Sequence, residues 1–161
     1  MTMEDTSGRG TVKSNPVALV PELLEDELAD LLAWSIELRQ LSWNLGPRAR
    51  LGLNQLLAEA TRDASRWMDC LAERLWDLGV APSNACVRPL LRPDPTGGRR
   101  INERSAGMTA GHLTGELAQR TALRARDERM TDAKAIGLLG AIEKELTIYA
   151  VLAGQPERLV R

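Results

Sequence analysis

Two carboxylates one helical turn apart are the residues of this chain best placed to do chemistry. Asp69 and Glu73 lie in the segment MDCLAERLWDLG (residues 68–79), whose apolar residues keep a helical spacing. Side chains at positions i and i+4 project from the same helix face, so these carboxylates can chelate one hard or borderline cation. Redox chemistry on Fe(II) needs further ligands, usually imidazole, and His112 is the only histidine. We expect His112 to be a surface or capping residue rather than a ligand.

Three interpretations of Asp69 and Glu73 are open from the residues alone. The carboxylates can be structural, because carboxylates on a helix are usually paired with neighbouring cations or with a partner subunit. They can instead form a weak site for Fe(II), Zn(II) or Mg(II), or belong to a working ferroxidase centre. The cations that would pair with them in the first interpretation are Arg62, Arg66 and Arg74.

A second group of charged residues lies in a stretch rich in proline and glycine. The net charge of −1 predicts no overall attraction to nucleic acid, but arginines gather in residues 88–104, opposed only by Asp94 and Glu103. This region is either a solvated surface or a patch that contacts phosphates. With two cations of the N-terminal tail, the candidate DNA-binding residues are Arg9, Lys13, Arg88, Arg92, Arg99, Arg100 and Arg104.

The spacing of apolar residues predicts four helices, at about residues 21–45, 53–78, 109–130 and 131–153. Gly79 is the stop signal of the second helix, and Thr131 is a candidate N-cap of the fourth, which leaves a very tight junction after the third. The connections are short, long and short, with the long one over residues 80–108. This order predicts an all-α, ferritin-like four-helix bundle with one long crossover. We expect a flexible N-terminal tail at 1–15, the bundle at 16–154 and a short C-terminal tail at 155–161.

Composition is that of a folded domain. Of the 161 residues 43% are hydrophobic and 27% charged, and no apolar run approaches the length needed to cross a bilayer. We therefore expect a cytoplasmic protein, associated with the nucleoid if it binds DNA. The spacing of the two cysteines, Cys70 and Cys86, does not indicate a disulfide. We expect Cys70 to be a small core or interface residue.

Two segments resemble the core of a known family. SIELRQLSWNLGP (residues 35–47) and MDCLAERLWDLG (residues 68–79) are similar, without a gap between them, to helices A and B of the Dps mini-ferritins, DNA-binding proteins from starved cells. DAKAIGLL (residues 132–139) and the following Glu143-Lys144 pair resemble the last helix of that family. The resemblance implies a homo-oligomeric hollow shell, a dodecamer, that stores iron and protects DNA under stress.

The same resemblance implies where iron would bind. In the family the ferroxidase site lies between two subunits, and three of its five ligand positions correspond here to Ser42, Asn54 and Ala58. The partner subunit contributes the other two, which match in Asp69 and Glu73. Serine and asparagine offer neutral oxygen atoms that bind metals weakly, and alanine offers no donor at all. Trp43, which flanks the iron site in the family, is also suited to packing at the two-fold interface.

Several functions therefore compete. The favoured interpretation is a Dps-like subunit with an incomplete ferroxidase centre, in which a second Dps-type subunit could supply the missing ligands within a mixed shell. The alternative is a non-catalytic ferritin-like scaffold or binding module that has lost iron oxidation. A third interpretation is a smaller helical oligomer whose likeness to Dps reflects only four-helix packing.

Overall fold

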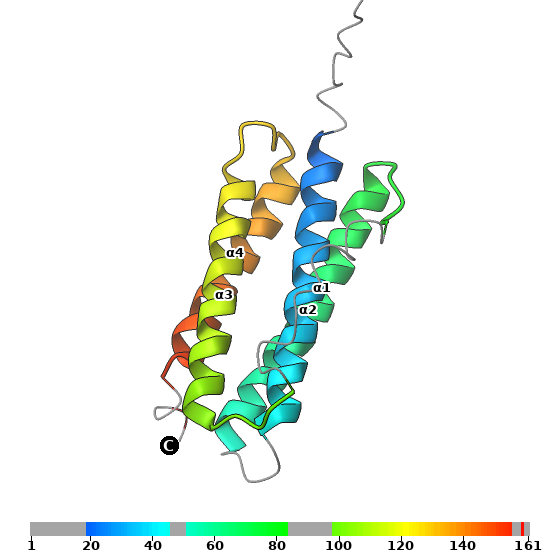
Figure 1. Ribbon diagram of the computed structural model, residues 1–161. Helices are drawn as coiled ribbons and strands as arrows, with labels where there is room; N and C mark the ends of the chain where they lie inside the picture. Colours follow the sequence, from blue (N-terminus) through cyan, green and yellow to red (C-terminus); the bar gives the residue numbers. More distant parts are fainter. Residues whose placement is uncertain (1–18, 46–50, 84–97, 156–158, 160–161) are drawn as a thin grey trace, which may run out of the picture.

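Four α-helices make up the structure, a computed structural model that describes residues 19–45, 51–83, 98–155 and 159 (Figure 1). They are α1 (Leu19–Leu45), α2 (Leu51–Asp77), α3 (Glu103–Ala125) and α4 (Ala133–Ala153). The described residues contain no strand, which confirms the predicted all-α class. None of the helices in this part of the chain is long and apolar enough to cross a membrane.

The helices form two antiparallel pairs. α1 packs on α2 and α3 on α4, and the pairs meet through α1 against α3 and α2 against α4. Between α2 and α4, the Tyr149 hydroxyl donates to Asp63 Oδ2 at 2.5 Å. The end of α2 and the start of α3 lie at opposite ends of the bundle, so the connection between them must span its length (Figure 1). The predicted ferritin-like bundle with one crossover is confirmed.

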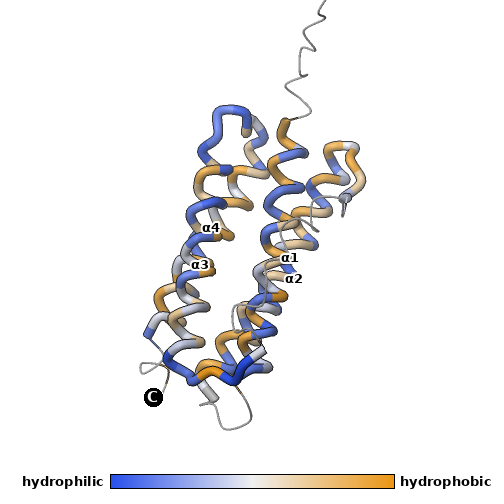
Figure 2. The backbone as a smooth tube through the Cα atoms, viewed as in Figure 1, coloured by the Kyte–Doolittle hydropathy of each residue, from blue (hydrophilic) through white to orange (hydrophobic). Residues whose placement is uncertain are grey.

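The core is formed by a mostly apolar stripe of buried residues along each helix. On α1 the buried residues Leu24, Leu31 and Leu38 recur every seven positions, interleaved with Trp34 and Leu41 at the intervening steps of three and four. Orange apolar and blue polar positions are consequently interleaved along α1 and α2 (Figure 2). The Trp34 ring stacks on Trp67 of α2 with centroids 6.3 Å apart. Its Nε1–H also donates to Thr114 Oγ1 of α3 at 3.0 Å, so one side chain joins three helices.

The helix α3 begins six residues earlier than the sequence predicted. Asn102 is its N-cap, with a side-chain oxygen that accepts from the Ser105 amide at 2.8 Å. The first two turns bury Ala106 and Ala110, which give a far weaker apolar signal than the leucines of α2. The helix ends at Ala125 rather than at Met130, so the predicted boundaries were wrong at both ends.

The junction between α3 and α4 is also longer than predicted and spans residues 126–132. Asp127 accepts from both the backbone amide and the guanidinium of Arg129, and this side-chain hydrogen bond lowers the pKa of Asp127 to about 2. Asp132, not Thr131, is the N-cap of α4 and accepts from the Ala135 amide at 2.7 Å. The hydrogen bond from Arg74 lowers the pKa of the Asp132 carboxyl, so this cap stays ionised and ties α2 to the start of α4.

The predicted stop of α2 is confirmed. Gly79 adopts a φ of +80°, a left-handed conformation that glycine reaches without steric cost. Its amide donates to the Trp76 carbonyl at 2.9 Å, and the Val80 amide donates to the Leu75 carbonyl at 3.0 Å. These bonds satisfy carbonyl groups that the last turn of the helix would otherwise leave unpaired.

Candidate metal centre

Two of the candidate ligand positions meet at the end of the α1–α2 pair. Ser42 lies in the last turn of α1 and Asn54 in the first turn of α2, and the antiparallel packing brings them together. The Ser42 hydroxyl donates to Asn54 Oδ1 at 3.2 Å, in a half-buried position. Each of these oxygen atoms therefore already has a protein partner.

A surface pocket of about 360 Å³ opens beside this pair, between α1 and α2. Ser42 and Trp43 form its wall at the end of α1, and Ala58 forms its wall on α2. Among the described residues, Arg39 brings the only charged side chain to the lining, which is completed by Leu38, Leu57 and Thr61. The described lining of the pocket therefore offers a cation and neutral groups but no carboxylate or imidazole.

Asp69 and Glu73 lie further along α2. Both are exposed and project from one face of the helix, as the sequence predicted. Eleven residues separate Ala58 from Asp69, which at 1.5 Å per residue is roughly 16 Å along the helix axis. Within one protomer these carboxylates cannot join Ser42 and Ala58 around a single ion.

The donors present in one protomer do not fit a redox iron centre. Among the described residues, no three histidine, cysteine, aspartate or glutamate side chains lie close enough to hold a metal ion. Asp69 and Glu73 remain a chelating pair of hard oxygen donors, which fits a weakly held divalent cation. Ser42 and Asn54 would have to give up their mutual hydrogen bond to contribute.

Two of the arginines considered as partners for these carboxylates pair elsewhere. Arg74 binds Asp77 and Asp132, while Arg66 binds Asp63 at 3.2 Å and contacts Glu145 of α4 at 3.4 Å. Within the described ranges, no ion pair of Asp69 or Glu73 is formed.

The remaining candidate ligands are separate from this region. His112 lies on the exposed face of α3, where its Nε2 is 3.4 Å from Glu116 Oε1 one turn later. The prediction of a surface histidine is confirmed. Cys70 is a half-buried free thiol on α2, and Cys86 lies outside the described residues.

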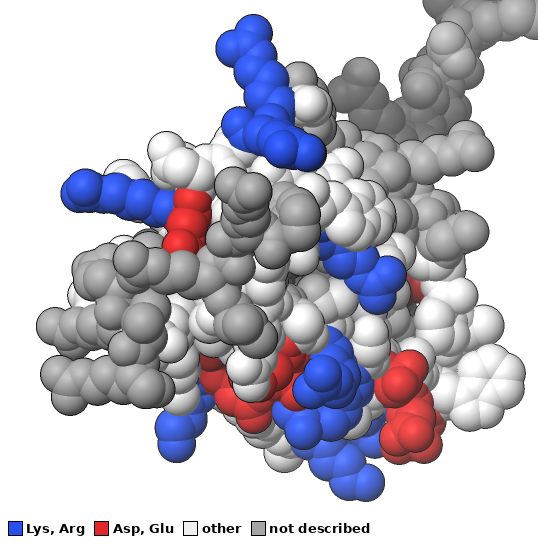
Figure 3. Space-filling model, turned by 90° about the horizontal axis from the view of Figure 1, so that it is seen from below, with Lys and Arg blue, Asp and Glu red and all other residues white. Residues whose placement is uncertain are grey.

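The candidate DNA-binding arginines are described only in part. Arg99 and Arg100 are exposed before α3, and Arg104 is exposed in its first turn. The segment is fixed to the bundle, because the Ile101 amide donates to the Asn44 carbonyl at 3.2 Å. Seen from this end, basic and acidic side chains lie next to each other (Figure 3). The other candidates, Arg9, Lys13, Arg88 and Arg92, lie outside the described residues.

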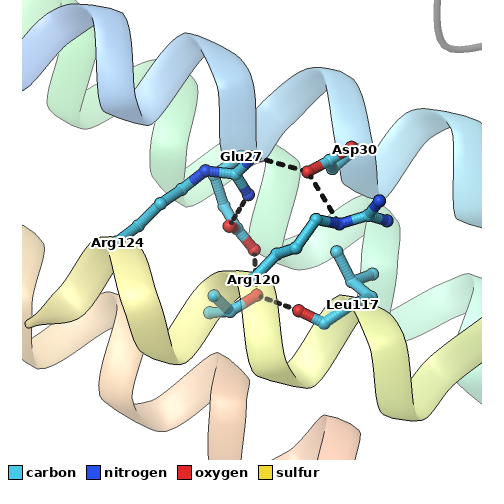
Figure 4. A network of polar contacts seen from close by, with 6 residues as sticks. Glu27, Asp30, Leu117, Arg120 and Arg124 are labelled. Atoms are coloured by element: carbon cyan, nitrogen blue, oxygen red, sulfur yellow. Dashed lines mark hydrogen bonds and ion pairs between the residues drawn. The ribbon is translucent and has the colours of Figure 1, made fainter.

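A buried cluster of charges that the sequence analysis missed lies between α1 and α3 (Figure 4). The Arg124 guanidinium donates to Glu27 Oε2 at 2.6 Å and to Asp30 Oδ2 at 2.5 Å. Thr121 donates to Glu27 Oε1 at 2.6 Å, and Arg120 Nε lies 3.3 Å from Asp30 Oδ2. Glu27 is 0% exposed, and burial raises the pKa of its carboxyl against the opposing effect of Arg124.

This cluster holds the two helix pairs together and lines none of the pocket described above. Two carboxylates face two guanidinium groups, so the charges of the cluster balance. One signal in the sequence could have revealed it. Glu27 occupies a position of the seven-residue core repeat, between Leu24 and Leu31, where an apolar residue is expected.

No protein-family model matches the sequence, and no curated protein matches it either. Solved structures do match. An N-terminal deletion mutant of Dps from Mycobacterium smegmatis has a TM-score of 0.78 at 16% identity, covering 92% of this chain and 100% of that chain. Antigen TpF1 from Treponema pallidum has a TM-score of 0.74 at 23% identity, covering 94% and 98%. Dps from Microbacterium arborescens in the high iron form has a TM-score of 0.75 at 13% identity, covering 92% and 97%. Likeness at these identities concerns the fold alone, and the chain therefore has the ferritin-like four-helix fold of Dps proteins.

Proposed function

We propose that this chain is a Dps-like mini-ferritin subunit with an incomplete intersubunit ferroxidase centre. It assembles into a hollow homo-oligomeric shell, a dodecamer by the resemblance, that sequesters iron and protects DNA under stress. Iron is the cargo of this shell rather than a resident cofactor. The structure of Dps from Microbacterium arborescens in the high iron form is one of the neighbours that supports an iron-related role.

The observation that carries the proposal is the arrangement along α1 and α2. The positions that resemble the ligand set of one subunit line or adjoin one pocket, and the two matching carboxylates lie exposed about 16 Å away. A second copy could bring its carboxylates to that pocket, although no single protomer can. The side chains of Ser42, Asn54 and Ala58 favour loss of the iron-oxidation step, since none of them supplies an imidazole or a carboxylate.

A non-catalytic scaffold is the second candidate, and a specific observation favours it. Ser42 and Asn54 hydrogen bond to each other at 3.2 Å, a contact that holds the ends of α1 and α2 together without any metal. A chain that had lost iron chemistry altogether would keep the framework and use these positions in this way.

Iron oxidation by the purified protein tests the proposal. We expect Fe(II) with oxygen or peroxide to be oxidised no faster than in buffer, and the ferric product to co-elute with the protein. The Asp69→Ala/Glu73→Ala variant should not change the rate. A matched control is Glu22→Ala/Asp26→Ala, which removes two exposed carboxylates that are likewise four residues apart, on α1.

Other outcomes of the same assay lead elsewhere. Saturable oxidation that is lost in Asp69→Ala/Glu73→Ala but retained in the control would contradict the incomplete centre and indicate a rebuilt one. Iron that never co-elutes with the protein would leave the scaffold as the better description.

DNA binding gives a separate prediction for the arginines before α3. Replacing Arg99 and Arg100 by alanine should abolish a mobility shift of duplex DNA. Each lost phosphate contact should also lower the slope of log affinity against log salt by roughly 0.9. The matched control is Arg126→Ala, an exposed arginine at the other end of α3. An unchanged mobility shift in the double variant would show that Arg99 and Arg100 do not contact DNA.

A further inference from the structure

The pocket between α1 and α2 is lined by groups that suit a small organic molecule. Arg39 and Trp43 lie one turn apart near the end of α1, and Thr61 of α2 lines the same pocket. With a volume of about 360 Å³ the pocket lies in the size range of sites for small ligands. The chemistry of its lining indicates which class of ligand it can hold.

The charge at the pocket favours an anion. Arg39 lines the pocket, and Arg62 is exposed on α2 one turn after the lining residue Ala58. Within the described ranges, neither arginine forms an ion pair or a hydrogen bond. The Arg39 guanidinium would repel a metal cation placed beside it, whereas a carboxylate or a phosphate can accept two parallel hydrogen bonds from the same group.

The two hydroxyl groups of the lining can serve a ligand as hydrogen-bond acceptors. The Thr61 hydroxyl donates to the Leu57 carbonyl at 2.8 Å, and the Ser42 hydroxyl donates to Asn54 Oδ1 at 3.2 Å. A hydroxyl group has a single hydrogen, so each oxygen has only a lone pair left for a ligand. A ligand that uses these oxygen atoms must therefore bring a donor, such as a hydroxyl or an amino group.

The rest of the described lining suits a flat apolar ring. Leu38, Leu57 and Ala58 have aliphatic side chains, and the Trp43 side chain beside them is 73% exposed. An aromatic ring gains from offset stacking on an indole in addition to the burial of its apolar surface. A flat ring would therefore cover Trp43 and contact the aliphatic side chains at the same time.

We propose that this pocket binds a small aromatic anion, a flat ring linked to a carboxylate or phosphate and bearing a hydroxyl or amino group. The anionic group pairs with Arg39, the ring lies against Trp43, and the donor reaches the oxygen of Ser42 or Thr61. An aromatic carboxylate and a nucleoside phosphate share this chemistry. The inference goes beyond the proposed function, because the site lies within one protomer and requires neither iron nor a shell.

Calorimetric titration of the full chain with matched small molecules tests the inference. Para-hydroxybenzoate should bind saturably, with one site per chain. Benzoate lacks the hydroxyl donor and phenol lacks the carboxylate, so each should bind on the order of 10-fold more weakly. AMP and adenosine are the corresponding pair for a nucleoside phosphate. Whichever of AMP and para-hydroxybenzoate binds more tightly identifies the source of the anion.

Variants of the pocket assign the contacts. Arg39→Gln should weaken para-hydroxybenzoate binding on the order of 10- to 100-fold, because it removes a charge-assisted pair, and should leave phenol binding unchanged. Trp43→Ala should weaken the binding of both molecules. The matched controls Arg126→Gln and Trp76→Ala replace exposed residues away from the pocket and should change neither. Circular dichroism of each variant separates loss of binding from loss of folding.

Three results would overturn the inference. The first is equal binding of para-hydroxybenzoate by the wild type and Arg39→Gln, and the second is no saturable binding of it or of AMP at millimolar concentration. The third is binding that appears only in Asp69→Ala/Glu73→Ala, because carboxylates of another copy would then fill the pocket. A shell that binds neither molecule contradicts this inference alone, and a monomer that binds one of them contradicts the proposed function alone.

Discussion

Replacing Arg124 by leucine is expected to destabilise the bundle by about 3–5 kcal/mol, because it leaves the buried Glu27 carboxylate without a cation and leaves Asp30 with Arg120 alone. The Arg124 side chain is only 16% exposed and binds both Glu27 and Asp30. Leucine fills much of the same space, so the loss comes from charge rather than from volume. Urea unfolding at a fixed protein concentration measures the change, which should be compared only between assemblies of equal mass.

The pH dependence of this variant has a defined sign. Burial already raises the pKa of Glu27, and loss of Arg124 should raise it further. A carboxyl with a raised pKa takes up its proton more readily in the folded than in the unfolded chain, so its contribution to stability is lost as pH rises. The deficit of Arg124→Leu should therefore shrink as pH falls from 7 toward 5.

Two further variants make the result specific. Adding Glu27→Gln to Arg124→Leu removes one buried charge and should recover part of the stability. Arg126→Leu, in which the lost arginine is exposed and pairs with Glu143 at 3.2 Å, should change stability by less than about 0.5 kcal/mol. A similar loss in both leucine variants would mean that the cluster does not hold α1 to α3.

Replacing Trp34 by alanine should cost about 3–5 kcal/mol, the usual range for deleting a large buried side chain. Trp34 is fully buried, stacks on Trp67 and donates to Thr114. Trp34→Phe keeps an aromatic ring but loses the N–H donor, so it should cost clearly less. Leu123→Ala is the control, since Leu123 is 71% exposed on α3. Equal unfolding midpoints for Trp34→Ala and Leu123→Ala would contradict this role of the tryptophan.

The sequence predicted the architecture well where core side chains are large. The leucines of α2 gave its extent and its stop at Gly79, and the lengths of the connections gave the crossover topology. The prediction from the sequence failed where the core side chains are small. The start of α3 buries Ala106 and Ala110, so the apolar period was recognised only beyond the true N-cap, Asn102.

The buried cluster was missed for a different reason. Glu27 and Asp30 lie in an acidic stretch near the predicted start of a helix. Carboxylates are common there because the positive end of the helix dipole stabilises them. Their partner Arg124 lies more than ninety residues away on α3. Only the packing register of α1 against α3 shows that these charges meet inside the bundle. The pocket beside Ser42 likewise depends on how α1 pairs with α2.

Light scattering of the wild-type chain at physiological salt tests most directly whether these helices build a shell. The proposed function predicts a single species with a mass many times the 17.7 kDa of the protomer. A monomer or dimer at every concentration would contradict the shell and assign the Dps-like fold to a smaller helical oligomer.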